Sequence, residues 1–301
     1  MKIAAGPVIG PIEDFGVPGA FEALEMRPGA DIAHLALRYQ GYSETVSSLS
    51  VDRMPAALFF PVIVNFGSRF VIHPADEDAA ARAHDSFAAG LIDRFTTVRF
   101  QERAACMQAD FSPFGARAFF GRPLHELTGQ VAALEDVIGP SARELEDRLR
   151  AARDWPARFR LLDGFVRDRL AHAAAPRGEV VHAWRLICGS AGGVRIGDVA
   201  REVGWSRRHL IQTFHEAVGH RPKTVAGILR FQHALRLAHR NGFDWAATAY
   251  DAGYADQAHL VRSFGRFAGL SPTAYVRSNS FNMRQPEVGM LDGTQPNGGP
   301  S

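Results

Sequence analysis

The sequence HLIQTFHEAVGHRPKTV, residues 209–225, returns fifty residues later as HLVRSFGRFAGLSPTAY, residues 259–275. The two stretches share residues of structurally special types, and these pairs are His209/His259, Leu210/Leu260, Phe214/Phe264, Gly219/Gly269 and Pro222/Pro272. Upstream, Ala200/Ala249 and Gly204/Gly253 match at an offset of 49. Self-similarity of this kind indicates a duplicated structural unit.

The first copy has the pattern of a helix, a tight turn and a second helix. Gly204 is placed to end the first helix because glycine adopts positive φ without strain, and Ser206 is placed to cap the second. Leu210 and Phe214 lie four residues apart and so share one face of that second helix. The apolar stripe of the first helix has the spacing i, i+3, i+4 and i+7, and it consists of Ile196, Val199, Ala200 and Val203.

The second copy repeats this pattern with its own caps. Asp244 and Asp256 are placed to cap its two helices, and Gly253 lies at the turn between them. Two helices joined by a short glycine turn are typical of a helix-turn-helix unit. We therefore predict helix-turn-helix units at about 196–217 and 245–267, joined by a helix over 223–240.

The two motifs carry a family resemblance. The first reads A-x-x-x-G-W-S-R-R-H-L-x-x-x-F…G-x-x-P and the second A-x-x-x-G-Y-x-D-Q-x-H-L-x-R-x-F…G-L-S-P-x-x-Y. This pair resembles the AraC/XylS transcriptional regulators, whose DNA-binding domain would cover residues 179–278. The resemblance implies that the second helix of each unit enters the major groove of DNA. It also implies that the base-reading residues are Arg208, Ile211 and Gln212 in the first unit and Gln257, Ala258 and Arg262 in the second.

These residue types suit base recognition in the major groove. Arginine can present two donors to the O6 and N7 acceptors of guanine, and glutamine can pair with N6 and N7 of adenine. Gln212 and Ala258 depart from the family, since many relatives carry arginine at the first position and a polar residue at the second. We expect four further basic residues to contact phosphates, namely Arg207, Lys223, Arg240 and Arg277.

The charge of the chain is unevenly distributed. Residues 185–278 carry 13 Lys and Arg against 6 Asp and Glu, a net +7, whereas residues 1–184 carry 20 against 24, a net −4. A basic domain behind an acidic one fits a partner that is a polyanion. Duplex DNA is therefore the predicted partner, with RNA polymerase and a small-molecule effector as further candidates.

The front part of the chain alternates strand-like runs with turns. Runs rich in aromatic and β-branched residues predict strands, and they cover residues 34–40, 57–67, 69–74, 96–101 and 106–111. Helical spacing follows in residues 142–153 and 156–173. The predicted fold class is α+β: an N-terminal β-barrel or sandwich over 1–125, a helical segment over 126–178, and then the all-α DNA-binding domain.

The order of strands and then helices also resembles the cupin-like sensory domain of the same family, on DFSPFGARAFFG and HELTGQVAALEDVIG. The resemblance implies a small effector in the barrel and a dimer contact through the helices, so a homodimer is expected. The phenylalanine-rich strands could line an apolar pocket, although most such rings pack as core. The alternative is a front domain that only dimerises or binds a protein partner.

A metal-dependent cupin enzyme is a competing hypothesis that the sequence disfavours. Its metal would need a cluster such as His-x-His with a nearby carboxylate, but His34, His73, His84 and His125 are scattered singly. We expect no catalytic residues, no cofactor and no metal.

The chain shows no signal peptide and no apolar run of about 18 residues, so we expect a cytoplasmic protein that does not enter the membrane. The polar tail over 279–301 is predicted to be disordered.

Overall fold

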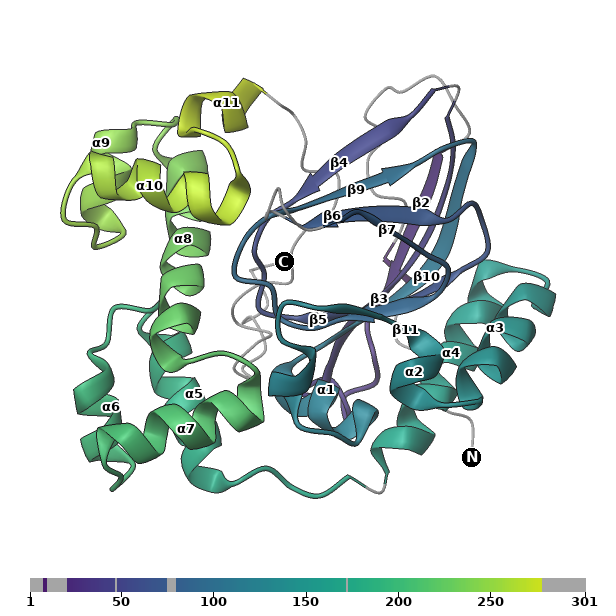
Figure 1. Cartoon of the computed structure of the whole chain (residues 1–301), viewed down its shortest axis with the longest axis horizontal. Helices are drawn as coiled ribbons and strands as arrows, with labels where there is room; N and C mark the ends of the chain where they lie inside the picture. The colour runs from purple at the N-terminus through teal and green to yellow at the C-terminus, as the bar shows by residue number, and fades with distance from the viewer. Residues whose placement is uncertain (1–7, 10–20, 47, 75–79, 172, 278–301) are drawn as a thin grey trace, which may run out of the picture.

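The computed structural model describes residues 8–9, 21–46, 48–74, 80–171 and 173–277, and it has two parts (Figure 1). The N-terminal part is built of β-sheets with helices packed against them, and the C-terminal part is helical throughout. The predicted α+β class, with strands first and helices after, is confirmed. The tail over 279–301 lies outside the described residues.

The strands of the N-terminal part form two antiparallel sheets. The larger has the order β1-β2-β3-β10-β5-β8-β11 and the smaller β4-β9-β6-β7. The strands are β1 (Val8–Ile9), β2 (Phe21–Met26), β3 (Ala36–Thr45), β4 (Ser50–Met54), β5 (Phe60–Asn65), β6 (Phe70–Pro74), β7 (Arg82–His84), β8 (Phe87–Ala89), β9 (Thr96–Phe100), β10 (Arg103–Phe111) and β11 (Val131–Ala133). Among the described strands no ladder joins the two sheets, so the barrel shape is loose rather than closed.

All five runs that the sequence marks as strands are strands in the structure: β3, β5, β6, β9 and β10. They hold the centre of the fold, because β10 pairs with both β3 and β5 and β9 pairs with β4 and β6. The short strands β7, β8 and β11 have three residues each, too few to give an alternating pattern. We predicted that the β-rich part ends at residue 125, but β11 lies beyond this position.

The larger sheet has a different neighbour on each face. One face meets the smaller sheet through an apolar cluster that includes Phe70, Phe87 and Phe100. The other face is covered by helices, since α1, α2 and α4 contact β10, β5 and β3. At Gly41 of β3 a side-chain Cβ would lie only 2.6 Å from the Trp155 ring of α4. Glycine therefore permits the close approach of this helix to the sheet.

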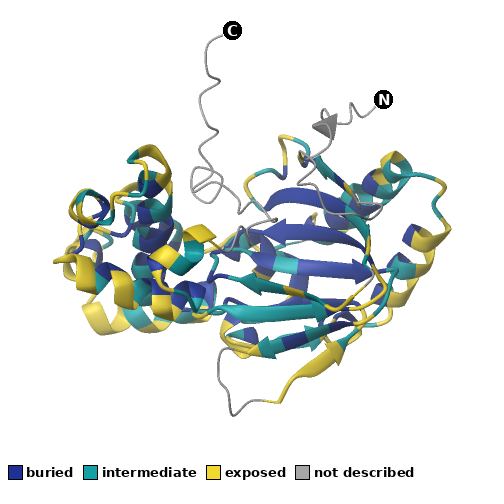
Figure 2. Ribbon diagram, turned by 90° about the horizontal axis from the view of Figure 1, so that it is seen from above, coloured by how far each residue is buried: buried dark blue, intermediate teal, exposed yellow. Residues whose placement is uncertain are grey.

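The helices of the N-terminal part are α1 (Pro113–Phe120), the 3-10 helix η1 (Leu124–Leu127), α2 (Leu134–Ile138), α3 (Ser141–Ala151) and α4 (Trp155–Leu170). Those of the C-terminal part are α5 (Gly178–Gly189), α6 (Ile196–Glu202), α7 (Arg207–Val218), α8 (Pro222–Arg240), α9 (Trp245–Asp251), α10 (Gln257–Ala268) and α11 (Pro272–Arg277). The central strands β3, β5 and β10 are largely buried, and the exposed residues of the helical part lie on its outer faces (Figure 2). In the described part of the chain, no helix combines the length and the apolar character needed to cross a bilayer.

Candidate nucleic-acid interface

The first helix-turn-helix unit consists of α6, a short turn and α7. Gly204 in the turn has φ 71°, a value that glycine adopts without the Cβ penalty of other residues. Ser206 caps α7, because its Oγ accepts a hydrogen bond of 3.2 Å from the backbone N–H of His209. Leu210 and Phe214 are fully buried and hold α7 against the rest of the domain. On the opposite face of α7, Arg208 and Gln212 are exposed.

The second unit repeats this geometry in α9 and α10. Gly253 in the turn has φ 69°, and the Asp256 carboxylate caps α10 by accepting a 2.6 Å hydrogen bond from the His259 N–H. Leu260 and Phe264 are fully buried, at the places that Leu210 and Phe214 have in the first unit. The duplication that the sequence predicts is thus also a duplication of caps, turns and buried anchors.

The helix α8 separates the two units and fixes their spacing. It has 19 residues, which corresponds to about 28 Å at 1.5 Å per residue. In Figure 1 it runs between the two units, with α7 at one end and α10 at the other. Val225, Ile228 and Leu229 on it are fully buried, so both units share its core. We refer to α7 and α10 below as the two recognition helices.

The six residues predicted to read bases lie on the outward face of the recognition helices. Arg208, Gln212, Gln257, Ala258 and Arg262 are exposed, and Ile211 is half-buried. Neither Arg208 nor Arg262 has an ion-pair partner in the part of the chain that the structure describes. The Gln212 amide nitrogen donates a 3.3 Å hydrogen bond to the Glu216 carboxylate. The amide oxygen of Gln212 has no hydrogen-bond partner among the described residues.

The four residues predicted to contact phosphates are also exposed, but they lie elsewhere on the domain. Arg207 begins α7, Lys223 lies in the first turn of α8, Arg240 ends α8, and Arg277 ends α11. The two conspicuous histidines are not part of the outward row. The His209 ring lies 4.6 Å from that of Trp205, and the His259 ring lies 5.0 Å from that of Tyr254.

The comparison with family models assigns this region. A model described as a helix-turn-helix domain matches residues 199–278, which include both turns, both recognition helices and α8. The C-terminal part of the chain is an AraC-type helix-turn-helix domain. A second model, described as a domain of unknown function, matches residues 25–133 in the β-rich part.

One similar protein is a transcriptional regulator by name. HTH-type transcriptional regulator Rv1931c of Mycobacterium tuberculosis is 33% identical to this chain over 91 residues, which is 30% of this chain and 35% of the relative. The match therefore spans about a third of the relative's length.

Two solved structures resemble most of the chain weakly. ToxT from Vibrio cholerae O395 is 12% identical, with a TM-score of 0.42 over 76% of this chain and 96% of ToxT. The AraC-like transcriptional activator CuxR is 16% identical, with a TM-score of 0.33 over 80% of this chain and 85% of CuxR.

A cavity of about 160 Å³ lies between the two sheets of the N-terminal part. Sequence reasoning assigned no effector residues, because the cavity is assembled from strands far apart in the chain. Its apolar lining includes four phenylalanines, one each from β6, β8, β9 and the residue before β5: Phe70, Phe87, Phe100 and Phe59. These rings therefore line a pocket as well as filling the core.

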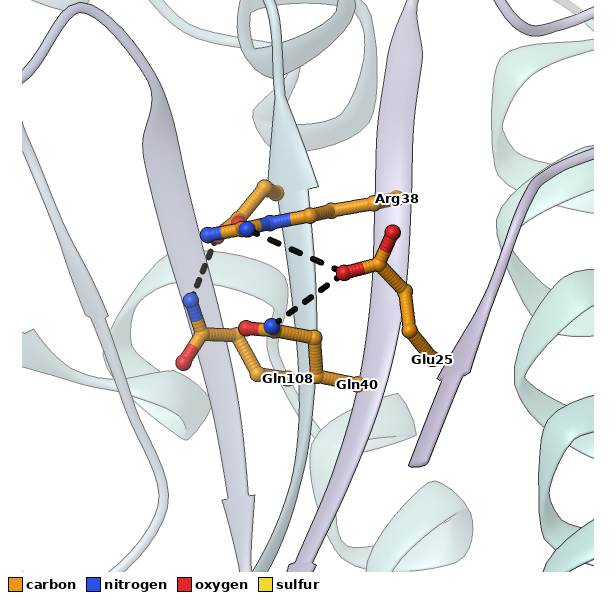
Figure 3. Close-up of polar contacts among 5 residues, drawn as sticks. Glu25, Arg38, Gln40 and Gln108 are labelled. Atoms are coloured by element: carbon orange, nitrogen blue, oxygen red, sulfur yellow. Dashed lines mark hydrogen bonds and ion pairs between the residues drawn. The ribbon is translucent and has the colours of Figure 1, made fainter. Parts of the chain in front are cut away.

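One wall of the cavity carries a buried polar network. The Arg38 Nε donates a 2.6 Å hydrogen bond to Asp110, and the Gln108 amide donates one of 2.7 Å to the other carboxylate oxygen. Glu25 lies 3.9 Å from the Arg38 guanidinium and accepts a 3.5 Å hydrogen bond from Gln40 (Figure 3). Burial raises the pKa of the Asp110 carboxyl, and the positive charge of Arg38 opposes this rise.

The N-terminal part holds both recognition helices at the glycines that end them. Arg53 of β4 donates a 3.0 Å hydrogen bond to the backbone oxygen of Gly269, and Thr128 donates one to the backbone oxygen of Gly219. The ion pair between Arg266 and Asp93 adds a third link. Since Arg53 also lines the cavity, the cavity wall touches the AraC-type domain directly.

The histidines weighed for a metal site stay apart from one another. No three His, Cys, Asp or Glu side chains lie close enough to hold a metal ion within the described ranges of the chain. His84 is on β7, His73 is on β6, and His125 in η1 lies near His215 of α7, with 5.8 Å between the ring centroids.

Proposed function

We propose that this protein is a sequence-specific transcription factor that binds duplex DNA through α7 and α10. The observation that carries the proposal is the pair of recognition helices at the two ends of α8, each with exposed arginine and glutamine on its outward face. Two such helices suit successive major-groove segments on one side of the duplex, about 34 Å apart. The relatives named above are regulators rather than enzymes, and we assign no catalytic residue.

Binding of the full chain to a labelled duplex of about 30 base pairs tests the DNA-binding part of the proposal. Fluorescence anisotropy should give saturable binding that weakens steeply as salt rises, because phosphate contacts release counterions. An affinity that does not depend on salt, or no binding at low salt, would contradict it. A basic protein of similar size and charge serves as the control for non-specific attraction.

We further propose that the cavity between the sheets is the site of a small-molecule effector. A mostly apolar cavity with a few placed polar groups is the usual form of a ligand site. Its wall residue Arg53 bonds to Gly269 at the end of α10, so a ligand that moves β4 would also move a recognition helix. Changed DNA affinity on adding metabolite mixtures would support this, and an affinity unmoved by any of them would favour a front domain that only dimerises or binds a protein.

We propose that the protein acts as a homodimer whose interface is formed by α4. One side of α4 carries the half-buried Leu161 and Phe165, with Gly164 between them, and nothing outside the local helix backbone lies within 4 Å of where a Gly164 Cβ would be. Arg160 and Asp168 are exposed and lie four residues to either side of that glycine. Two antiparallel copies of α4 crossing at Gly164 would place each arginine opposite an aspartate, as a two-fold interface requires.

These proposals imply where the protein works and which partners it meets. A regulator that binds duplex DNA would work in the cytoplasm, where chromosomal DNA is accessible. RNA polymerase stays a predicted partner, to which we assign no surface.

A further inference from the structure

The cavity between the sheets has one polar wall on the larger sheet and a mostly apolar lining elsewhere, with Asp52, Arg53, Arg94 and Thr96 as the exceptions. Arg38 and Tyr42 of β3 and Gln108 of β10 line the polar wall, and they lie side by side because Cys106 pairs with Tyr42 and Asp110 with Arg38 in the ladder. The smaller sheet supplies apolar lining opposite: Phe70, Ile72, Val98 and Phe100. A ligand that fits must therefore be apolar over most of its surface and polar at one edge.

The size of the cavity limits the ligand. Its volume of about 160 Å³ is close to that of an engineered apolar cavity of about 150 Å³ that binds benzene. One six-membered ring with a small substituent fills such a space. A long acyl chain or a fused ring system would have to extend outside it.

The arginines of the cavity are poorly placed to bind an anionic ligand, because Arg53 already donates to Gly269 and Arg94 is exposed to solvent. The Arg38 guanidinium is 2.6 Å from the fully buried Asp110 carboxylate and 3.9 Å from Glu25. A ligand carboxylate at this wall would have to compete with Asp110 for the arginine and would lie near two negative charges. Removing a charged group from water without a partner of its own is strongly unfavourable.

Gln108 offers the hydrogen-bonding group that an uncharged ligand could use. Its amide nitrogen is bonded to Asp110, which fixes the orientation of the side chain, and in Figure 3 its oxygen points away from that network. Within the described part of the chain this oxygen accepts no hydrogen bond. It is also not fully buried, since it is absent from the buried polar atoms that have no partner. It is therefore an acceptor on the cavity wall, suited to a ligand hydroxyl.

We infer that the cavity binds a small uncharged molecule of one six-membered ring that carries a hydroxyl, of the phenol or cyclohexanol class. The ring lies among the phenylalanines, and the hydroxyl donates its hydrogen bond to the Gln108 oxygen. This inference rests on the proposed effector function, since it names the chemical class of ligand for the same site.

Calorimetric titration of the full chain with phenol, cyclohexanol, toluene and benzoate tests the inference. We expect one saturable site for phenol and cyclohexanol, with phenol about threefold to tenfold tighter than toluene, the range that one hydrogen bond of ordinary strength gives. Benzoate should bind more weakly than toluene. Benzoate binding more tightly than phenol, or no saturable binding of phenol and toluene, would overturn the inference.

Two variants locate the binding. Gln108→Met keeps the length of the side chain but removes the acceptor, so phenol and toluene should bind equally. Ala89→Leu fills space at the cavity wall and should abolish binding of both, with circular dichroism as the check that the variant folds. An unchanged preference for phenol in Gln108→Met, or unchanged binding in a folded Ala89→Leu variant, counts against the site.

The DNA affinity separates this inference from the function on which it rests. If phenol binds the wild-type cavity but leaves the affinity for duplex DNA unchanged, the ligand class is supported and the effector response is contradicted. If a metabolite mixture changes the DNA affinity while phenol and cyclohexanol do not bind, the ligand class is wrong and the effector response is supported.

Discussion

Arg53 of the cavity wall donates a 3.0 Å hydrogen bond to the backbone oxygen of Gly269, the residue at which the second recognition helix ends. The equivalent glycine of the first unit, Gly219, accepts a hydrogen bond from Thr128 of the same N-terminal domain. Both glycines have positive φ and end their helices in the left-handed conformation. Their own carbonyl groups, one residue past each helix, accept the hydrogen bonds from the N-terminal domain. One domain thus holds the two recognition helices at matching points.

Removing the arginine should loosen the second recognition helix. In Arg53→Ala the Gly269 carbonyl loses its charged donor and Phe95 loses the guanidinium that lies 5.1 Å from its ring. A hydrogen bond to a charged group contributes about 1.5 kcal/mol or more, so amide exchange in α10 and α11 should become roughly tenfold faster. Hydrogen exchange with mass spectrometry measures this.

The matched control is Arg69→Ala, since Arg69 is exposed and pairs with the exposed Asp85. It should leave exchange in α10 unchanged. Equal protection of α10 in the wild type and in Arg53→Ala would mean that this contact does not hold the helix.

The contact between the domains should weaken in acid. Burial lowers the pKa of His220, and His215 and Arg266 lower it further, whereas Asp93 and a hydrogen bond at Leu91 raise it. Because the folded pKa lies below 6.5, the unfolded chain binds more protons between the two values. The stabilisation is complete above about pH 6.5 and is lost as pH falls through the folded value.

Thermal unfolding between about pH 8 and about pH 5 measures this effect. The midpoint temperature should fall less on acidification in His220→Gln than in the wild type, because glutamine stays neutral. His34→Gln, at an exposed position, should keep the wild-type slope. An identical dependence of the midpoint temperature on pH in all three proteins would contradict a role of His220 in the loss of stability in acid.

The two classes of DNA contact should differ in specificity. Arg262→Ala should lose about 1 to 3 kcal/mol of affinity on a preferred site and little on random duplex. Lys223→Ala should weaken both alike and should reduce the slope of log affinity against log salt by about 1. Anisotropy titrations on both duplexes at several salt concentrations distinguish these results, and equal losses for Arg262→Ala on both duplexes would assign it to phosphates instead.

The proposed α4 interface can be tested by charge reversal. Arg160→Asp and Asp168→Arg should each shift the protein toward monomer, because like charges would then face each other across the two-fold axis. The double variant should restore the dimer. Sedimentation equilibrium of the four proteins measures this, and a wild type that stays monomeric at all concentrations would contradict the interface.

The sequence predicted the C-terminal part closely because its signals are local. Gly204, Ser206 and Asp256 act on the helix beside them, and their caps and turns appear in the structure as expected. The linking helix was predicted over 223–240 and spans Pro222–Arg240. The bases that the residues of α7 and α10 read are determined in the complex with DNA, so the base-reading assignments stay predictions.

The cavity could not be predicted in the same way. Arg38 and Asp110 are 72 residues apart, and only the pairing of β3 with β10 brings them together. In the sequence each is one charged residue within a strand, where a solvent-facing position is the ordinary reading. Contacts between domains, such as Arg53 with Gly269, depend on docking that no local pattern encodes.

Selection of bound sites from a pool of random duplexes, with the full chain as the selecting protein, tests the central claim most directly. Two recognition helices held by α8 predict an enriched motif of two short blocks whose centres lie about one helical turn apart, ~34 Å along the duplex. The same selection with Arg262→Ala should lose preference in one block only. Enrichment of a single block, or none above the starting pool, would contradict the claim that both units read DNA.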